Sequence, residues 1–203
     1  MNRSVSLGII LAGFLCAPAG VVHAAGDPAA GKLKFSTCMG CHGIPGYSNV
    51  YPTYHVPRLG GQHAEYIVAA LKGYAANDRD HATMHANAAA LSEQDMADIA
   101  AFLASLALAH APRVNPPGDP EAGQKKSATC VACHAENGIS PSGQFPILAG
   151  QHADYLIKAL QDYKSGARKN AIMSGMAAAL TAQDQADLAS YYANQETGLV
   201  VVE

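Results

Sequence analysis

Two short segments contain the residues whose types and spacing can do chemistry. The pattern Cys-x-x-Cys-His occurs at residues 38–42 (CMGCH) and again at residues 130–134 (CVACH). Two thiols about one helical turn apart can add to the two vinyl groups on one edge of a porphyrin, and the histidine that follows can supply an imidazole to the iron. Both segments therefore predict covalent attachment of a c-type haem. The predicted haem links are Cys38, Cys41, Cys130 and Cys133, and the predicted first iron ligands are His42 and His134.

A dithiol redox site and a zinc site are the alternatives for these two segments. A thioredoxin-like Cys-x-x-Cys is expected within a βαβ unit, and the sequence shows no strand pattern around either motif. Structural zinc usually draws its four ligands from more closely spaced pairs, whereas 92 residues separate the two motifs. Haem is the prediction that fits both segments.

The two motifs belong to a longer internal repeat. Residues 27–31 match residues 119–123 at the same offset of 92 residues that relates the motifs. After the motifs the offset falls to 89 residues, which relates residues 61–63 (GQH) to residues 150–152 (GQH). The first copy therefore carries a longer loop, within residues 43–56. A repeat of this length indicates a tandem duplication.

The duplication divides the chain into two predicted domains preceded by an export signal. The domains are expected at residues 25–111 and 119–203, and the proline-rich residues 112–118 are expected to form an extended linker. Residues 1–24 have a short basic start, an apolar run and small residues at their end, which is typical of a cleaved secretory signal peptide. A retained membrane anchor is the alternative, but the apolar run is shorter than the ~20 residues that a spanning helix needs.

Removal of that signal would leave four of the five cysteines, because Cys16 lies within it. All four remaining cysteines are in the haem motifs. This arrangement favours the periplasm, since c-type haem is attached outside the cytoplasm. The chain has a formal net charge of −3, and only 14% of its residues are charged, so nucleic acid is excluded as a partner.

Helical periodicity predicts an all-α fold with about three main helices in each copy, packed around a covalent haem. The first helix of each copy would start at an Asp-Pro pair, a combination typical of a helix N-cap and first turn. The third would start at a Ser or Thr with Asp three residues later, which resembles a capping box. The predicted positions are Asp27 and Asp119 for the first helix, residues 62–76 and 151–164 for the second, and Ser92 and Thr181 for the start of the third.

The ligand on the other side of each iron separates electron transfer from catalysis. Methionine opposite histidine raises the reduction potential and closes the iron to small molecules. In the first copy Met84, in the predicted loop before the third helix, is the natural candidate. In the second copy both Met173 and Met176 are available, and the repeat favours Met173 because it matches Met84. Histidine ligation is the remaining alternative. The histidines that could provide it are His55, His63, His81, His85 and His152.

Two prolines are placed where they could orient the first iron ligands. Pro57 and Pro146 are equivalent in the repeat, and each precedes a glycine-containing turn. A carbonyl near such a proline can accept the free ring N–H of a ligating histidine and so fix its orientation. An ordinary turn proline is the alternative.

The combination of tandem Cys-x-x-Cys-His domains, the two Gly-Gln-His-x-x-Tyr segments and the two Met-x-x-x-Ala-x-x-Leu segments resembles cytochrome c4, a group of dihaem class I c-type cytochromes. The resemblance covers essentially the whole chain after the signal. It implies two class I cytochrome c domains related by a pseudo-twofold axis. It also implies ligation of the irons by His42 with Met84 and by His134 with Met173.

Two classes of function are open to such a chain. The first is a periplasmic carrier of single electrons, without catalysis of its own. The resemblance implies a quinol-oxidising complex or a soluble donor on one side, and a haem–copper terminal oxidase on the other. The second is the haem subunit of a periplasmic dehydrogenase, such as a flavocytochrome, or a dihaem peroxidase. The sequence leaves open a peripheral association with a membrane.

Overall fold

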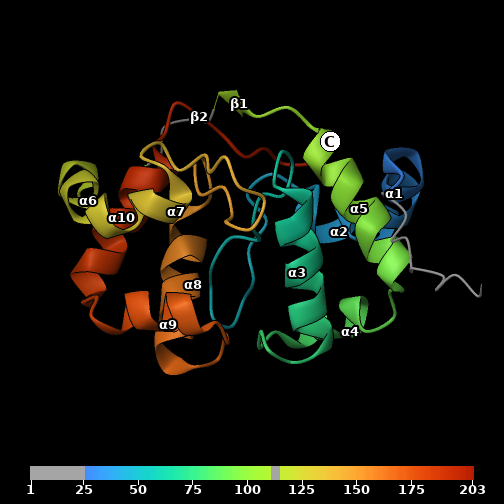
Figure 1. Cartoon of the computed structure of the whole chain (residues 1–203), viewed down its shortest axis with the longest axis horizontal. Helices are drawn as coiled ribbons and strands as arrows, with labels where there is room; N and C mark the ends of the chain where they lie inside the picture. Colours follow the sequence, from blue (N-terminus) through green and yellow to red (C-terminus); the bar gives the residue numbers. More distant parts are fainter. Residues whose placement is uncertain (1–25, 111–114) are drawn as a thin grey trace, which may run out of the picture.

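The computed structural model describes residues 26–110 and 115–203. The predicted export signal and part of the predicted linker lie outside the described residues. The described chain forms two helical halves that stand side by side, coloured blue to green and yellow to red in Figure 1. This architecture agrees with the predicted all-α fold built from two tandem domains.

The same order of helices occurs in both halves. The first half contains α1 (Pro28–Lys34), a 3-10 turn (Phe35–Thr37), α2 (Met39–His42), α3 (Ala64–Ala75), α4 (Ala82–Ala88) and α5 (Glu93–Ser105). The second half contains α6 (Pro120–Lys126), a 3-10 turn (Ser127–Thr129), α7 (Val131–His134), α8 (Ala153–Ser165), α9 (Ala171–Ala178) and α10 (Ala182–Ala193). None of these described helices combines the length and apolar character needed to cross a membrane.

The helix starts follow the predicted capping residues. The Asp27 carboxylate accepts a hydrogen bond from the backbone N–H of Ala29 at 2.8 Å, and Asp119 repeats this at α6. Ser92 and Asp95 form a reciprocal capping box at the start of α5, and the same box occurs at the start of α10. The repeat therefore specifies these helix starts twice, through equivalent side chains.

The residues just before α5 form a short helix, whereas the sequence predicted a loop. Met84 lies within the short helix α4 and not in a loop, and Met173 lies within α9. His81 begins α4, because its Nδ1 accepts the Met84 N–H at 3.2 Å. Asn170 begins α9 in the same way, by accepting the Met173 N–H at 3.0 Å. Each of these helices has about two turns and carries its methionine within a regular element.

A buried aspartate joins the first and last helices of each half. Asp98 on α5 is 3% exposed and accepts hydrogen bonds from the Asp27 N–H at 2.8 Å and from the Lys34 ammonium at 2.6 Å. The helices cross closely at Gly31, where an added Cβ would lie 1.9 Å from the Asp98 carbonyl oxygen. Only glycine allows that approach. The equivalents in the second half are Asp187, Asp119, Lys126 and Gly123.

The end of the chain crosses from the second half back to the first. Strands β1 (Ala109–His110) and β2 (Thr197–Gly198) pair antiparallel, with Ala109 opposite Gly198, its own counterpart in the repeat. Val200 then exchanges two backbone hydrogen bonds with Gly60, at 3.0 and 3.1 Å. Val202 is 1% exposed and packs in the apolar core of the first half. Figure 1 shows the C-terminus beside α5.

Candidate functional site

The two motif histidines make the same contact with the backbone. His42 ends α2 and His134 ends α7. The Nδ1 atom of His42 lies 3.0 Å from the carbonyl oxygen of Pro57, and that of His134 lies 3.0 Å from the carbonyl oxygen of Pro146. The predicted contacts between these carbonyls and the histidine rings are therefore present. With Nδ1–H donated to a carbonyl, Nε2 carries the lone pair, which is the form of imidazole that a metal binds.

Burial keeps both motif histidines neutral. Loss of solvent lowers the pKa of His42 and of His134 below the usual value, and the hydrogen bonds to the proline carbonyls only partly oppose this. Burial also raises the pKa of the Cys38 and Cys130 thiols. None of the four motif cysteines forms a disulfide with another described residue. Two thiols and a neutral imidazole on one short helix form the donor set that covalent haem requires.

The candidate methionines differ in exposure. Met84 and Met173 are half-buried at equivalent positions of α4 and α9, whereas Met176 is 47% exposed. Met96 is 5% exposed and packs in the core, as a methionine in an apolar helical stripe usually does. Burial therefore favours Met173 over Met176 as the second-half ligand, in agreement with the repeat.

The other histidines make contacts of their own. His81 begins α4 as described, and the Nδ1 of His85 donates to the Tyr74 carbonyl at 2.9 Å. His55 lies in the longer loop of the first half and pairs with Asp154 of the second half at 2.7 Å. His63 contacts the Ser140 carbonyl at 2.8 Å. The His152 ring stacks on that of His55, with centroids 4.6 Å apart. These contacts weaken the histidine alternative for the sixth ligand.

Two buried arginines face each other where the halves meet. Arg79 and Arg168 are 8% and 7% exposed, and they form a backbone bridge with each other. Arg79 donates to the Tyr155 hydroxyl at 3.2 Å, and Arg168 donates to the Tyr66 hydroxyl at 2.6 Å. Burial alone would raise the pKa of Tyr66, but the two guanidinium groups lower it to about 8.

These arginines have no carboxylate partner among the described residues, and Arg79 Nε is buried without any hydrogen-bond acceptor. Tyrosine rings supply other contacts, with Arg79 over Tyr74 at 4.4 Å and Arg168 over Tyr163 at 4.5 Å. A buried cation without a carboxylate partner can still pair with an anion. The carboxylate side chains of a haem would be such anions. The thiols and the imidazole of each motif therefore fit the group that the motifs predict, and the two guanidinium groups are free of carboxylate partners among the described residues.

Several of these residues were missed in the sequence. Arg79 and Arg168 are equivalent at the offset of 89 residues, as are Gln62 and Gln151, which lie 3% and 5% exposed between the halves. The repeat alignment that identified the methionines contained this signal. The sequence alone does not reveal that a second domain covers these charged and amide side chains.

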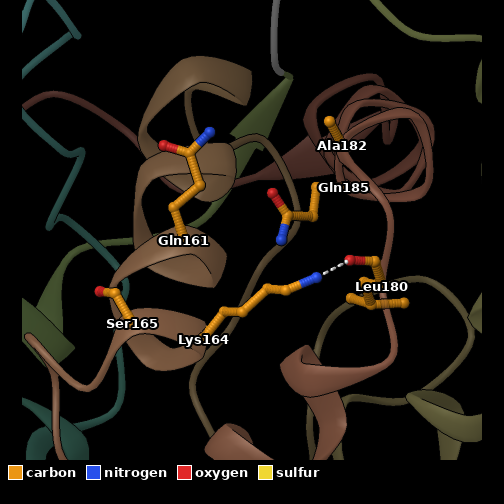
Figure 2. A pocket seen from close by; sticks show the side chains of 6 residues that line it. All are labelled: Gln161, Lys164, Ser165, Leu180, Ala182 and Gln185. Atoms are coloured by element: carbon orange, nitrogen blue, oxygen red, sulfur yellow. Dashed lines mark hydrogen bonds between the residues drawn. The ribbon is translucent and has the colours of Figure 1, made fainter.

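A surface groove of about 370 Å³ lies apart from these sites, on the second half. It is lined by Gln161, Lys164, Ser165, Leu180, Ala182 and Gln185. Figure 2 shows Lys164 crossing the groove to donate to the Leu180 carbonyl, at 2.6 Å. The lining contains no cysteine, histidine or carboxylate, so the groove adds no candidate for redox chemistry.

Comparison with known proteins also points to covalent haem in both halves. The family model "Cytochrome c" matches residues 28–107 and 120–195. The chain is 36% identical over 184 residues to "Cytochrome c4" of Pseudomonas aeruginosa, covering 85% of this chain and 90% of that one. It is 32% identical over 180 residues to "Thiosulfate dehydrogenase electron acceptor" of Stutzerimonas stutzeri, covering 79% and 81%. The crystal structure of reduced cytochrome c4 from Pseudomonas stutzeri matches with a TM-score of 0.67 and 31% identity, covering 84% and 100%.

Proposed function

Since the chain belongs to the cytochrome c family, and within it to the cytochrome c4 group, we propose that it passes single electrons between a respiratory donor and a terminal oxidase in the periplasm. The chain is a dihaem electron-transfer protein with two covalent c-type haems, and it is an electron carrier and not an enzyme.

We infer that the first haem is held by Cys38 and Cys41, with His42 and Met84 on its iron. The second is held by the equivalent residues of the second half. These are Cys130 and Cys133, with His134 and Met173. Bound haem supplies reversible one-electron chemistry at its iron. The chain holds the neutral imidazoles in a fixed orientation, places each methionine on a short helix, and compensates negative charge with Arg79 and Arg168.

One observation carries this proposal, namely the matched pair of contacts between the His42 and His134 rings and the Pro57 and Pro146 carbonyls. A hydrogen bond of this kind raises the basicity of a ligating imidazole and fixes its ring plane. Its occurrence at both motifs, with the same 3.0 Å distance, supports two equivalent irons. Two equivalent irons without an open coordination position support transport of electrons over catalysis.

The remaining parts of the proposal concern export, domains and partners. Residues 1–24 are proposed to direct export and to be removed, and residues 112–118 to link domains at 25–111 and 119–203. A quinol-oxidising complex or a soluble donor is proposed to reduce the protein, and a haem–copper terminal oxidase to oxidise it. The low charge of the chain supports weak and quickly released docking to such partners.

An optical redox titration of the purified holoprotein tests the ligands. We expect the charge-transfer band of methionine-ligated ferric haem, and two one-electron steps. A colourless protein, or a spectrum of histidine ligation at both irons, would contradict the proposal. A matched control is Met96→Leu, which changes a buried core methionine and should leave the band intact.

The second candidate function is to accept electrons from one particular periplasmic dehydrogenase. The similarity to a thiosulfate dehydrogenase electron acceptor favours this function. In that case a dehydrogenase should reduce the protein much faster than a quinol-oxidising complex does. A haem subunit of a flavocytochrome would behave in the same way, whereas a dihaem peroxidase needs one iron that binds small ligands. Prompt, stoichiometric binding of carbon monoxide to one haem of the reduced protein would favour the peroxidase and contradict the carrier.

A further inference from the structure

Two buried glutamines make reciprocal contacts between the domains. The side chain of Gln62, in the first domain, accepts the Ile147 N–H at 2.9 Å and donates to the Ile147 carbonyl at 3.0 Å. The side chain of Gln151, in the second domain, accepts the Arg58 N–H at 3.0 Å and donates to the Arg58 carbonyl at 2.9 Å. Each amide thus holds both backbone polar groups of one residue in the other domain.

The residues held in this way lie next to the acceptors of the proposed iron ligands. Arg58 directly follows Pro57, and Ile147 directly follows Pro146. The Pro57 carbonyl and the Arg58 N–H belong to one planar peptide group. That single group accepts from His42 Nδ1 on one side and donates to Gln151 on the other. The peptide group between Pro146 and Ile147 does the same between His134 and Gln62.

Such a chain of hydrogen bonds has two effects on the histidine. It fixes the position of the accepting carbonyl, because the peptide group cannot rotate without losing its bond to the glutamine. It also polarises that carbonyl, since hydrogen bonds in series strengthen one another inside a protein. A stronger acceptor increases the electron donation of a ligating imidazole to its metal.

We propose that Gln151 is a positioning residue for the first haem and Gln62 a positioning residue for the second, each acting across the domain interface. The inference rests on the proposed ligation by His42 and His134. It makes the domain interface part of both ligand environments. Each haem would then be tuned by the other domain as well as by its own.

A local role for the same glutamines is the competing explanation. Gln62 Oε1 also accepts the N–H of His63 at 3.0 Å, and Gln151 Oε1 accepts that of His152 at 2.9 Å, immediately before α3 and α8. If that role dominated, replacing a glutamine would affect the haem of its own domain. The proposal predicts the crossed pattern, so the two explanations give opposite results.

The test is a redox titration of the Gln151→Met and Gln62→Met holoproteins, since methionine keeps the length but cannot form these hydrogen bonds. The two steps are assigned by NMR signals of Phe35, whose ring centroid lies 6.4 Å from that of His42, and of Phe145, equally far from that of His134. In Gln151→Met the first haem should become easier to reduce. In Gln62→Met the second haem should.

We expect a change on the order of threefold in the ferrous-to-ferric ratio at fixed potential, or about 30 mV at 59 mV per tenfold. Mutation of a group that hydrogen-bonds directly to a metal ligand typically changes metal affinity or activity by about 10–100-fold. The glutamine bond lies one hydrogen bond further from the iron, so we expect a smaller effect. The matched control is Gln161→Met, the same substitution on α8 in the surface groove of Figure 2, which should shift neither step. If Gln151→Met does not fold, the shorter Gln151→Asn replaces it, with the same expectation.

Amide hydrogen exchange at Arg58 gives a readout of the contact that does not depend on potential. Exchange of this N–H should accelerate in Gln151→Met, and that of Ile147 in Gln62→Met. Three results overturn the inference. They are a shifted reduction potential at the haem of the substituted domain, an equal shift at both haems, and no shift at either. Failure to observe two haem steps in the unsubstituted protein would instead overturn the proposed function.

Discussion

Val202 is expected to stabilise the domain at the opposite end of the sequence. Its side chain is 1% exposed and packs with Phe35, Ile67 and Leu103 of the first domain. Val202→Ala removes two buried methyl groups, each worth about 0.8 kcal/mol. With a contribution from the small cavity left behind, the free energy of unfolding should fall by about 2 kcal/mol. This is a factor of about 30 in the unfolding equilibrium constant.

Hydrogen exchange in the folded holoprotein measures this loss for each domain separately. Protection should fall at the Ile99 and Leu103 amides of α5 but not at Leu188 of α10. Val201→Ala is the matched control, because Val201 is the neighbouring valine and is only partly buried. Loss of protection at Leu188 alone, or equal effects of the two substitutions, would show that the end of the chain does not support the first domain.

Two further predictions concern one ligand and one ion pair. Met173→Ala should remove about half of the methionine charge-transfer band, while Met176→Ala should leave it intact; the reverse result would identify Met176 as the ligand. Hydrogen bonds from Lys34, from the Asp27 N–H and from Gln94 lower the pKa of Asp98 to about 2. Because this value lies below that of the unfolded chain, the stabilisation is present above about pH 4 and is lost as the pH falls towards 2. Between about pH 5 and pH 2 the free energy of unfolding should therefore fall less steeply in Asp98→Asn than in the unsubstituted protein. Equal slopes in the two proteins would contradict this.

The repeat carried most of what the sequence could predict. The capping residues Asp27, Ser92 and Thr181 act within a few residues of themselves, so their roles are visible in the local sequence. The Pro57 and Pro146 acceptors were predictable because the histidine motif and the proline both recur. Local signals that recur in the same order in both copies are strong evidence even without any knowledge of the tertiary structure.

The helices α4 and α9 and the domain interface were not predicted, for different physical reasons. The two helices are short and rich in alanine, so they show no apolar stripe, although Asn170 before α9 is a recognisable N-cap signal. The partners of Gln62 and Gln151 lie in the other domain, 85 and 93 residues away. Periodicity reports which face of an element is buried and does not identify its distant partner.

The position of Val202 also affects the order in which the molecule can be assembled. Val202 and Val200 follow the second domain in the sequence, yet they complete the core and the backbone pairing of the first. The core of the first domain therefore closes only when this segment docks on it. An enzyme that attaches haem to Cys38 and Cys41 before that step would meet a first domain whose core is still open.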